Sequence, residues 1–203
     1  LLQPYSTFPI CAWVNFQWLS YIAATYREGD HSMKVDSNNT PTKYMAEYGP
    51  VSYRSPGVCV SCQASNIPLN AVAGGDGREG EITYVGRAVQ SGDVIPGKIV
   101  LSRACCFVGY NNVEYKLRDY QAFVADPASL EWLPSSDGAV PSGAIQGGVT
   151  SSGEPLYVGR ALHKGMKVLG KVQPSQRCAI VPLGGVEHRY TEYEVLVCKA
   201  NKL

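Results

Sequence analysis

Charged residues and histidines are both scarce in this chain of 203 residues, and each scarcity argues against a class of function. Only 17% of the residues are charged, the formal net charge is +1, and lysine and arginine form no run. A nucleic-acid-binding protein would instead carry a basic patch. The three histidines form no His-Glu-x-x-His motif, and there is no Gly-x-Ser-x-Gly elbow or phosphate-binding glycine loop. The sequence therefore predicts a non-enzymatic protein that needs no cofactor.

Helical periodicity is missing as well. No window carries apolar residues at helical spacing over three turns, which argues against long helices. Short runs of β-branched and aromatic residues, such as 178–181 and 193–197, instead alternate with clusters of glycine, proline and serine. Runs of this kind are typical of strands separated by turns. The sequence therefore predicts an all-β fold.

The first 44 residues differ from the rest of the chain. No charge occurs from Leu1 to Tyr26, but Pro4 and Pro9 interrupt this apolar run and no basic residue precedes it. It therefore predicts neither a signal peptide nor a transmembrane segment, and the location is left open between the cytoplasm and secretion without a recognisable signal peptide. Residues 27–44 are polar and are typical of a linker. We expect residues 1–44 to lie outside the fold; the alternative is that they cover an exposed sheet edge.

Seven cysteines cannot all pair within the chain, because their number is odd. Cys59-x-x-Cys62 is the only spacing that resembles a metal or redox site. Zinc would need two more ligands at a matching spacing, and a redox motif would need a βαβ context. Cys105 and Cys178 lie in apolar runs and are predicted to be buried free thiols. We therefore predict no metal site.

An internal duplication organises the chain. The sequence Tyr-Val-Gly-Arg-Ala occupies 84–88 and again 157–161, an offset of 73 residues, and Gly-Lys recurs with the same offset at 97–98 and 170–171. The recurring glycines indicate positions of positive φ or close backbone approach. One repeat of about 70 residues is near the lower size limit for an independent core. Two tandem repeats of short antiparallel strands, packed with pseudo-twofold symmetry, are therefore predicted.

These motifs resemble the DM9 (DM-nine) repeat family. The resemblance is carried in order by Pro-x-x-Ala-x-x-Gly-Gly, Tyr-Val-Gly-Arg-Ala, Pro-Gly-Lys, Gly-Gly-x-Glu-His and Tyr-Glu-Val-Leu, and it covers roughly residues 48–199. The second copy carries the pattern almost whole, with Leu169 in place of the proline. We expect the first repeat to span 45–126 and the second 127–203. The resemblance implies an all-β lectin similar to invertebrate mannose-binding DM9 proteins and to the related modules of natterin-type toxins.

The resemblance also implies where a sugar would bind. Lys98 and Lys171 occupy the lysine position of Pro-Gly-Lys, and in mannose-binding relatives this lysine acts with an acidic residue shortly after the Gly-Gly pair. In the first copy Gly77 occupies the position of that acid and Asp76 lies one residue before it, whereas the second copy has Thr150 at this position and no acid there. The predicted ligand-binding residues are therefore Asp76, Lys98 and Lys171, with the first site the stronger. As surface side chains, the two lysines should contribute little to stability.

The expected function is recognition of mannose-type glycans, for instance on microbes in innate immunity. Homodimer formation is left open, since two weak sites gain avidity when they act together. The main alternative is a structural or protein-interaction module that keeps the fold and has lost the sugar site. A membrane-acting toxin module is a weaker alternative, because the long Ser/Thr-rich insertion loop of an aerolysin-like pore protein is absent.

Overall fold

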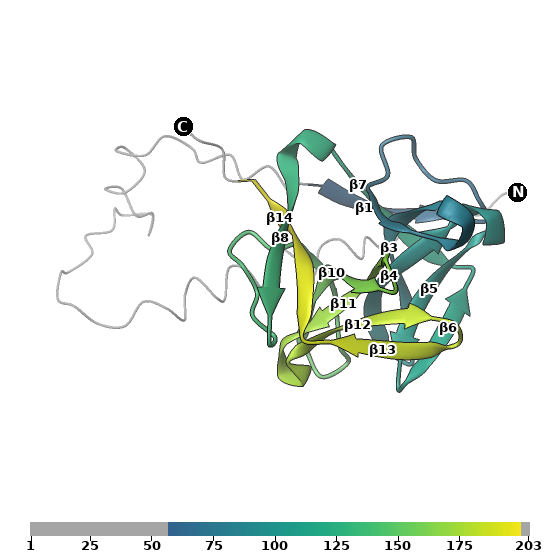
Figure 1. The fold of residues 1–203 in the computed structure, drawn as a ribbon. Coiled ribbons are helices and arrows are strands. Elements are labelled where there is room, and N and C mark those ends of the chain that lie inside the picture. The colour runs from purple at the N-terminus through teal and green to yellow at the C-terminus, as the bar shows by residue number, and fades with distance from the viewer. Residues whose placement is uncertain (1–56, 200–203) are drawn as a thin grey trace, which may run out of the picture. The chain divides into compact units, whose positions relative to one another are not determined.

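The computed structural model of the chain describes residues 57–199, and the described part consists of strands, turns and short 3₁₀ segments (Figure 1). The all-β prediction is confirmed. The prediction that residues 1–44 lie outside the fold falls outside the described residues. The strands are β1 (Gly57–Cys62), β2 (Ala73–Asp76), β3 (Ile82–Gln90), β4 (Asp93–Val100), β5 (Cys105–Tyr110), β6 (Val113–Leu117), β7 (Tyr120–Ala125), β8 (Leu130–Ser136), β9 (Gln146–Val149), β10 (Pro155–His163), β11 (Met166–Gln173), β12 (Cys178–Leu183), β13 (Val186–Tyr190) and β14 (Glu192–Cys198). The 3₁₀ segments are η1 (Arg78–Gly80), η2 (Leu101–Arg103), η3 (Pro127–Ser129) and η4 (Pro174–Gln176).

Antiparallel pairing joins the strands in the order β1-β7-β3-β4-β5-β6-β13-β12-β11-β10-β14-β8. The short strand β9 pairs with both β10 and β4, and it thereby closes part of this sheet into a ring. The ring runs through β4, β5, β6, β13, β12, β11, β10 and β9. Strands β6 and β13 are joined through the antiparallel pairing of Val113 with Val186. Both copies of the repeat therefore contribute strands to one hydrogen-bonded ring.

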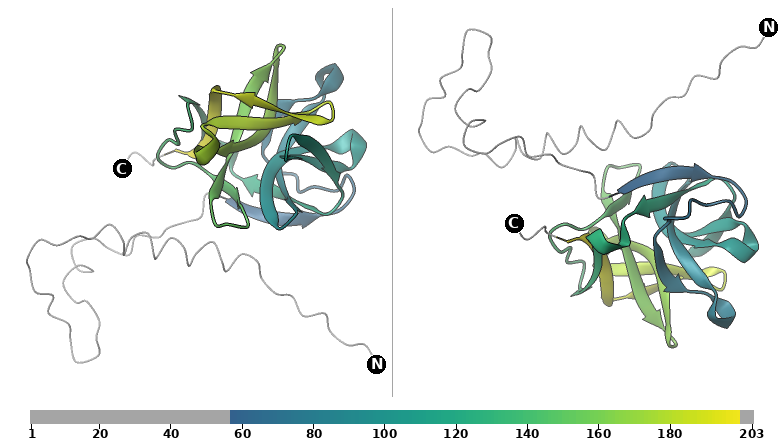
Figure 2. Two further views of the ribbon diagram at one scale, coloured as in Figure 1. Left: turned by 90° about the horizontal axis from the view of Figure 1, so that it is seen from below. Right: turned by 90° about the horizontal axis from the view of Figure 1, so that it is seen from above.

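Each strand of the first copy has a counterpart about 73 residues later in the second, as β3 has in β10 and β4 in β11. The two copies lie side by side, with β12 and β13 reaching across to β5 and β6 (Figures 1 and 2). The shared sequence explains part of this recurrence, because Gly92 and Gly165 hold equivalent hairpin turns with φ of 87° and 86°. A residue with a Cβ is strained in that left-handed region. A twofold axis relating the copies stays a prediction.

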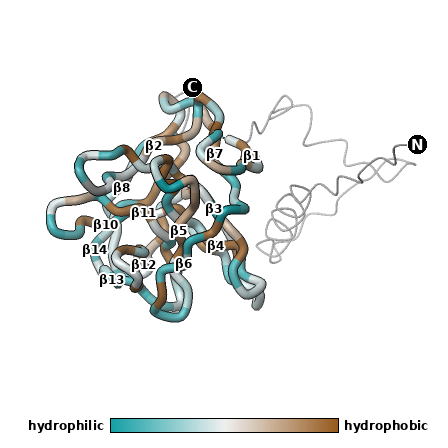
Figure 3. Tube along the Cα trace, turned by 90° about the vertical axis from the view of Figure 1, so that its right-hand side faces the viewer, coloured by the Kyte–Doolittle hydropathy of each residue, from teal (hydrophilic) through white to brown (hydrophobic). Residues whose placement is uncertain are grey.

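The apolar core is shared between the copies. One cluster joins Val85 and Phe123 of the first copy to Val158, Leu169 and Leu196 of the second. In the view of Figure 3, apolar segments lie mainly along the strands, whereas several connecting turns are hydrophilic. Cys105 and Cys178 are buried free thiols, as predicted. Because this burial crosses from one copy to the other, neither repeat keeps its full core without its partner.

Two arginines join the copies through their shared Tyr-Val-Gly-Arg-Ala motif. Arg87 donates to the side chain of Gln121 at 2.7 Å and to a backbone oxygen of the second copy, that of Gly147. Arg160 makes the equivalent contacts from the second copy: it donates to the side chain of Glu194 at 2.7 Å and to the backbone oxygen of Gly74 in the first copy at 2.9 Å. Each arginine therefore stabilises the Gly-Gly segment of the other copy.

The carboxylate of Glu194 gives this contact a pH dependence. Burial by itself would raise the pKa of Glu194, but the hydrogen bond and charge of Arg160, with help from Lys167, lower the pKa below its ordinary value. A carboxyl whose pKa is lowered by folding stabilises the fold above its unfolded pKa, and this stability is lost as the pH falls through the folded pKa. The first copy has a glutamine, Gln121, at the position equivalent to Glu194. Replacing Glu194 with glutamine therefore removes this titration.

We therefore expect Glu194→Gln to lose less stability than the parent chain on acidification below about pH 4. Urea unfolding from neutral to acidic pH measures this, with the exposed Glu192→Gln on the same strand as the control. Parallel pH profiles for Glu194→Gln and the parent chain would contradict the assignment.

Candidate functional site

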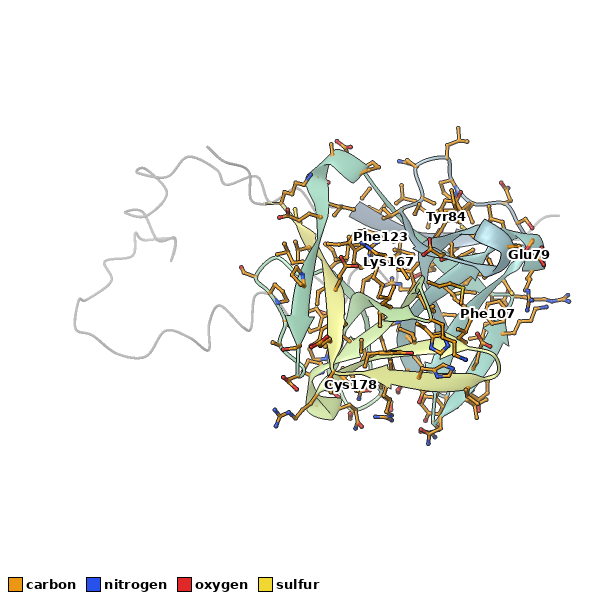
Figure 4. The ribbon with its side chains drawn as sticks, in the orientation of Figure 1. Glu79, Tyr84, Phe107, Phe123, Lys167 and Cys178 are labelled. Carbon is orange, nitrogen blue, oxygen red and sulfur yellow. The ribbon has the colours of Figure 1, made fainter. Side chains whose placement is uncertain are left out.

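A cavity of about 450 Å³ opens between the two copies. Its walls come from Asp76 at the end of β2 and the segment that follows it, and from β3, β4, η2, β5 and β6 of the first copy. The second copy contributes Met166 and residues 183–185, at the turn between β12 and β13. A volume of this size lies in the usual range for small-molecule sites. Figure 4 shows two of its lining residues, Glu79 and Phe107, on the side of the fold formed by the first copy.

Lys98 lies in the wall of this cavity and is only 5% exposed. Its ammonium group is 3.1 Å from the carboxylate of Glu114 and also donates to the backbone oxygen of Pro182 in the second copy. The expectation of a surface lysine is therefore wrong, because β4 is buried on both of its faces over most of its length. A buried ammonium needs such partners, since an unpaired charge is costly away from water.

Asp76 lines the same cavity from the end of β2, and its side chain is exposed. One carboxylate oxygen accepts a hydrogen bond from the backbone N–H of Lys167 at 2.8 Å, which ties this segment to the second copy. The structure therefore brings Asp76 and Lys98, two of the three predicted site residues, to one cavity. A carboxylate and an ammonium together can accept and donate hydrogen bonds to the hydroxyl groups of a ligand.

Lys171, the third predicted site residue, does not line this cavity. It is 5% exposed, pairs with Glu187 at 3.4 Å and donates to the backbone oxygen of Gly109 at 2.9 Å. Lys98 makes the equivalent contacts from the first copy: it pairs with a glutamate of its own copy and donates to a backbone oxygen of the other copy. The structure therefore brings Lys171 into the junction between the copies and leaves it apart from Asp76 and Lys98.

The carboxylates of these ion pairs also bind turns. Glu114 accepts the backbone N–H of Gly185 at 2.7 Å, and Glu187 accepts that of Asn112 at 2.8 Å. Glu81, by contrast, accepts both the N–H and the hydroxyl of Ser102, and Glu154 does the same with Ser175 in the second copy. All these contacts recur in both copies, which marks them as part of the scaffold.

Four further side chains of the cavity were not singled out from the sequence. They are Glu79, Thr83, Arg103 and Phe107. The guanidinium of Arg103 lies 5.8 Å from the ring centroid of Phe107, and the ammonium of Lys98 lies 5.4 Å from it. At each of these four positions the second copy has a different residue. A comparison that looks for residues shared by the two copies therefore does not find them. The useful signal was the set of positions at which the copies differ.

Two other groups of residues carry side chains suited to metal binding or acid–base chemistry. His163 and His188 stack with ring centroids 4.5 Å apart, and His163 Nδ1 lies 2.5 Å from the hydroxyl of Tyr190. Burial, the neighbouring His188 and nearby lysines lower the pKa of His163. Over residues 57–199 no group of three or more His, Cys, Asp or Glu side chains is placed to hold a metal ion. In the Cys59-x-x-Cys62 pair, Cys62 is a buried free thiol.

The fold and the cavity define a class: an all-β protein with an internal sequence duplication and a ligand-sized cavity lined by residues of both copies. A model of the DM9 repeat matches residues 76–190, more than half of the chain, and the protein therefore belongs to the DM9 repeat family. Natterin-3 of Thalassophryne nattereri is 31% identical over 132 residues, which are 64% of this chain and 33% of that protein. The chain thus spans about a third of the length of this relative.

Among solved structures, the nematode sperm cell motility protein MFP2B is similar in fold, with a TM-score of 0.55 at 18% sequence identity. The similarity covers 72% of this chain and 47% of that one. At this identity the likeness concerns the fold alone. Over residues 57–199, no helix is long and apolar enough to span a bilayer.

Proposed function

We propose that the protein is a non-enzymatic, lectin-like module that binds mannose-type glycans in the cavity of the first copy. The observation that carries this proposal is that Asp76 and Lys98 line one cavity of about 450 Å³ in a DM9 protein. The carboxylate of Asp76 would accept hydrogen bonds from neighbouring sugar hydroxyls. Lys98 would donate to a hydroxyl oxygen from a position that Glu114 and the backbone of Pro182 hold in place. Glycans displayed by microbes are the expected targets.

A second site at Lys171 is part of the proposal but should be weaker. Val149 stands at the position of Asp76 in the second copy, so this lysine has no equivalent carboxylate beside the Gly-Gly pair. Useful avidity would then come from association of two chains rather than from two equal sites on one chain. Whether the chain forms a homodimer stays a prediction that light scattering can test.

The specific rival is an interaction module without a sugar site. It is favoured by the structural use of both lysines, each of which joins the two copies through an ion pair and a backbone oxygen. A glycan array probed with the purified chain separates the two functions. Binding to mannose-containing glycans supports the lectin, and no binding to any glycan supports the interaction module.

Asp76→Asn is the sharpest test of the site. The amide oxygen can still accept the N–H of Lys167, so the segment should stay in place, but the charge-assisted bonds to a sugar are lost. Because one such bond is worth about 1.5–3 kcal/mol, we expect mannose affinity to fall by about tenfold or more. Calorimetry with Asp119→Asn as an exposed control measures this. Equal affinity of the Asp76 variant and the parent would remove Asp76 from the site.

A further inference from the structure

The two copies provide an internal comparison that separates scaffold from site within the cavity. Lys98, Glu114 and Glu81 have identical counterparts in Lys171, Glu187 and Glu154, and each pair makes equivalent contacts in the structure. The second copy makes these contacts without lining the cavity of the first. The contacts recorded for these three side chains are therefore contacts of the scaffold.

The remaining polar lining is particular to the first copy. Asp76, Glu79, Thr83 and Arg103 have the counterparts Val149, Ser152, Leu156 and Gln176. In the second copy three of these four positions have lost a charge, and the fourth has become a buried leucine. Since both copies build the same strands, the fold does not require the polar set. The polar set is therefore a feature of this cavity rather than of the repeat.

The charge of the cavity indicates what kind of ligand it accepts. Lys98 and Glu114 neutralise each other at 3.1 Å. Among the lining side chains that the structure describes, the remaining carboxylates are those of Asp76, Glu79 and Glu81, and the remaining cation is the guanidinium of Arg103, so carboxylates outnumber cations there. Asp76 and Glu79 are exposed, so two of these carboxylates lie on the solvent side of the cavity. Such a cavity attracts cations and disfavours carboxylates.

A buried hydroxyl supplies a second, independent indication. Thr83 is 0% exposed and lines the cavity, and its Oγ1 has no hydrogen-bond partner in the part of the chain that the structure describes. A buried hydroxyl without a partner is unfavourable, and a polar ligand group that reaches it would remove that cost. Gly75 leaves room beside this hydroxyl, since a Cβ there would lie 2.7 Å from Oγ1.

We propose that this cavity prefers an amino sugar, a hexose that carries a primary ammonium group, over the neutral hexose. The inference rests on the proposed lectin function and names the ligand class of the same site. The ammonium group donates to the carboxylates of Asp76 and Glu79, and a hydroxyl group of the sugar hydrogen-bonds with Thr83. A hexuronic acid is disfavoured, because its carboxylate meets the same two side chains.

Calorimetry with a matched set of ligands tests the preference: mannosamine, N-acetylmannosamine, mannose and mannuronic acid, at about pH 6, where a primary amine of this kind is protonated. We expect mannosamine to bind at least about fivefold more tightly than mannose, the ratio given by one charge pair at about 4 Å in water. N-acetylmannosamine should lose this advantage, and mannuronic acid should bind most weakly. The advantage should shrink in about 1 M salt.

Variants locate the effect. Glu79→Gln should reduce the preference for mannosamine, and Arg103→Gln, which introduces the residue of the second copy, should increase it. Thr83→Leu, also a residue of the second copy, should weaken all four sugars together. Glu131→Gln, an exposed carboxylate on β8, is the matched control and should change nothing. Equal melting temperatures across Glu79→Gln, Arg103→Gln and Glu131→Gln show that binding differences do not arise from unfolding.

The outcomes separate this inference from the proposed function. If mannose binds and mannosamine binds no better, the lectin stands and the amino-sugar preference is overturned. If ethanolamine, an amine without a sugar ring, binds as tightly as mannosamine, the sugar ring is not recognised and the inference fails. If no sugar binds at all, both proposals fail.

Discussion

Lys171→Met is expected to lower the free energy of unfolding by about 3–5 kcal/mol, the usual cost of removing one partner from a buried ion pair. The substitution keeps the length of the side chain but leaves the carboxylate of Glu187, which is 2% exposed, without its cation. The backbone oxygen of Gly109 loses its hydrogen bond from Lys171 as well. Urea unfolding at neutral pH measures the loss.

A double variant distinguishes the unpaired charge from lost packing. Lys171→Met combined with Glu187→Gln removes the buried negative charge, and the neutral amide can remain near the N–H of Asn112. We expect the double variant to recover most of the stability, because a neutral side chain is less costly to bury. Lys116→Met, on the exposed face of β6, should have little effect and serves as the control. A double variant no more stable than Lys171→Met would mean that the charge was not the cause.

Lys98 is also held in a buried ion pair, so a Lys98 variant would lose stability as well as any ligand contact. Lys98 makes the equivalent ion pair with Glu114, so its removal would disturb the junction between the copies as well as any ligand contact. A loss of sugar binding in a Lys98 variant would therefore have two causes. Asp76 is the better probe, because its conservative variant can keep the one backbone contact that the structure records.

Much of the fold could be predicted from the sequence. The constant offset of the motifs and the short β-rich runs predicted an all-β repeat protein, and the strands recur at that offset. Arg87 and Arg160 each donate to a backbone oxygen of the other copy, and Arg160 also binds Glu194 of its own copy. The partner copy could not be predicted, because sequence spacing gives no information on how two repeats pack.

The candidate site could be predicted only in part. Asp76 and Lys98 were found through a family motif, and they do line one cavity. The burial of Lys98 was missed because a lysine in a strand usually indicates a solvated face, whereas β4 is covered on both sides. Thr83 was missed because a threonine in a β-rich run is ordinary. Only the three-dimensional structure reveals that its hydroxyl lacks a hydrogen-bond partner within residues 57–199.

The glycine pairs near the start of each repeat were predicted to allow close backbone approach, and Gly148 shows why. A Cβ at this position would lie 1.9 Å from the backbone oxygen of Val94, on the strand that β9 joins to close the ring. Backbone atoms of a paired strand cannot move aside as the end of a side chain can. Gly148 therefore sets how closely β9 approaches β4.

We expect Gly148→Ala to destabilise the protein by about 3 kcal/mol, the upper part of the range for overpacking, because β9 must move away from β4. Gly74→Ala is the matched comparison: the three atoms nearest to its Cβ would belong to side chains, the nearest being Cζ2 of Trp132 at 2.8 Å, and these can shift. Its cost should therefore be smaller. Urea unfolding of both variants measures the difference, and hydrogen exchange at the amides of β4 and β9 should rise in Gly148→Ala alone. Equal losses in the two variants would show that β9 moves freely and that its contact with β4 does not hold the ring closed.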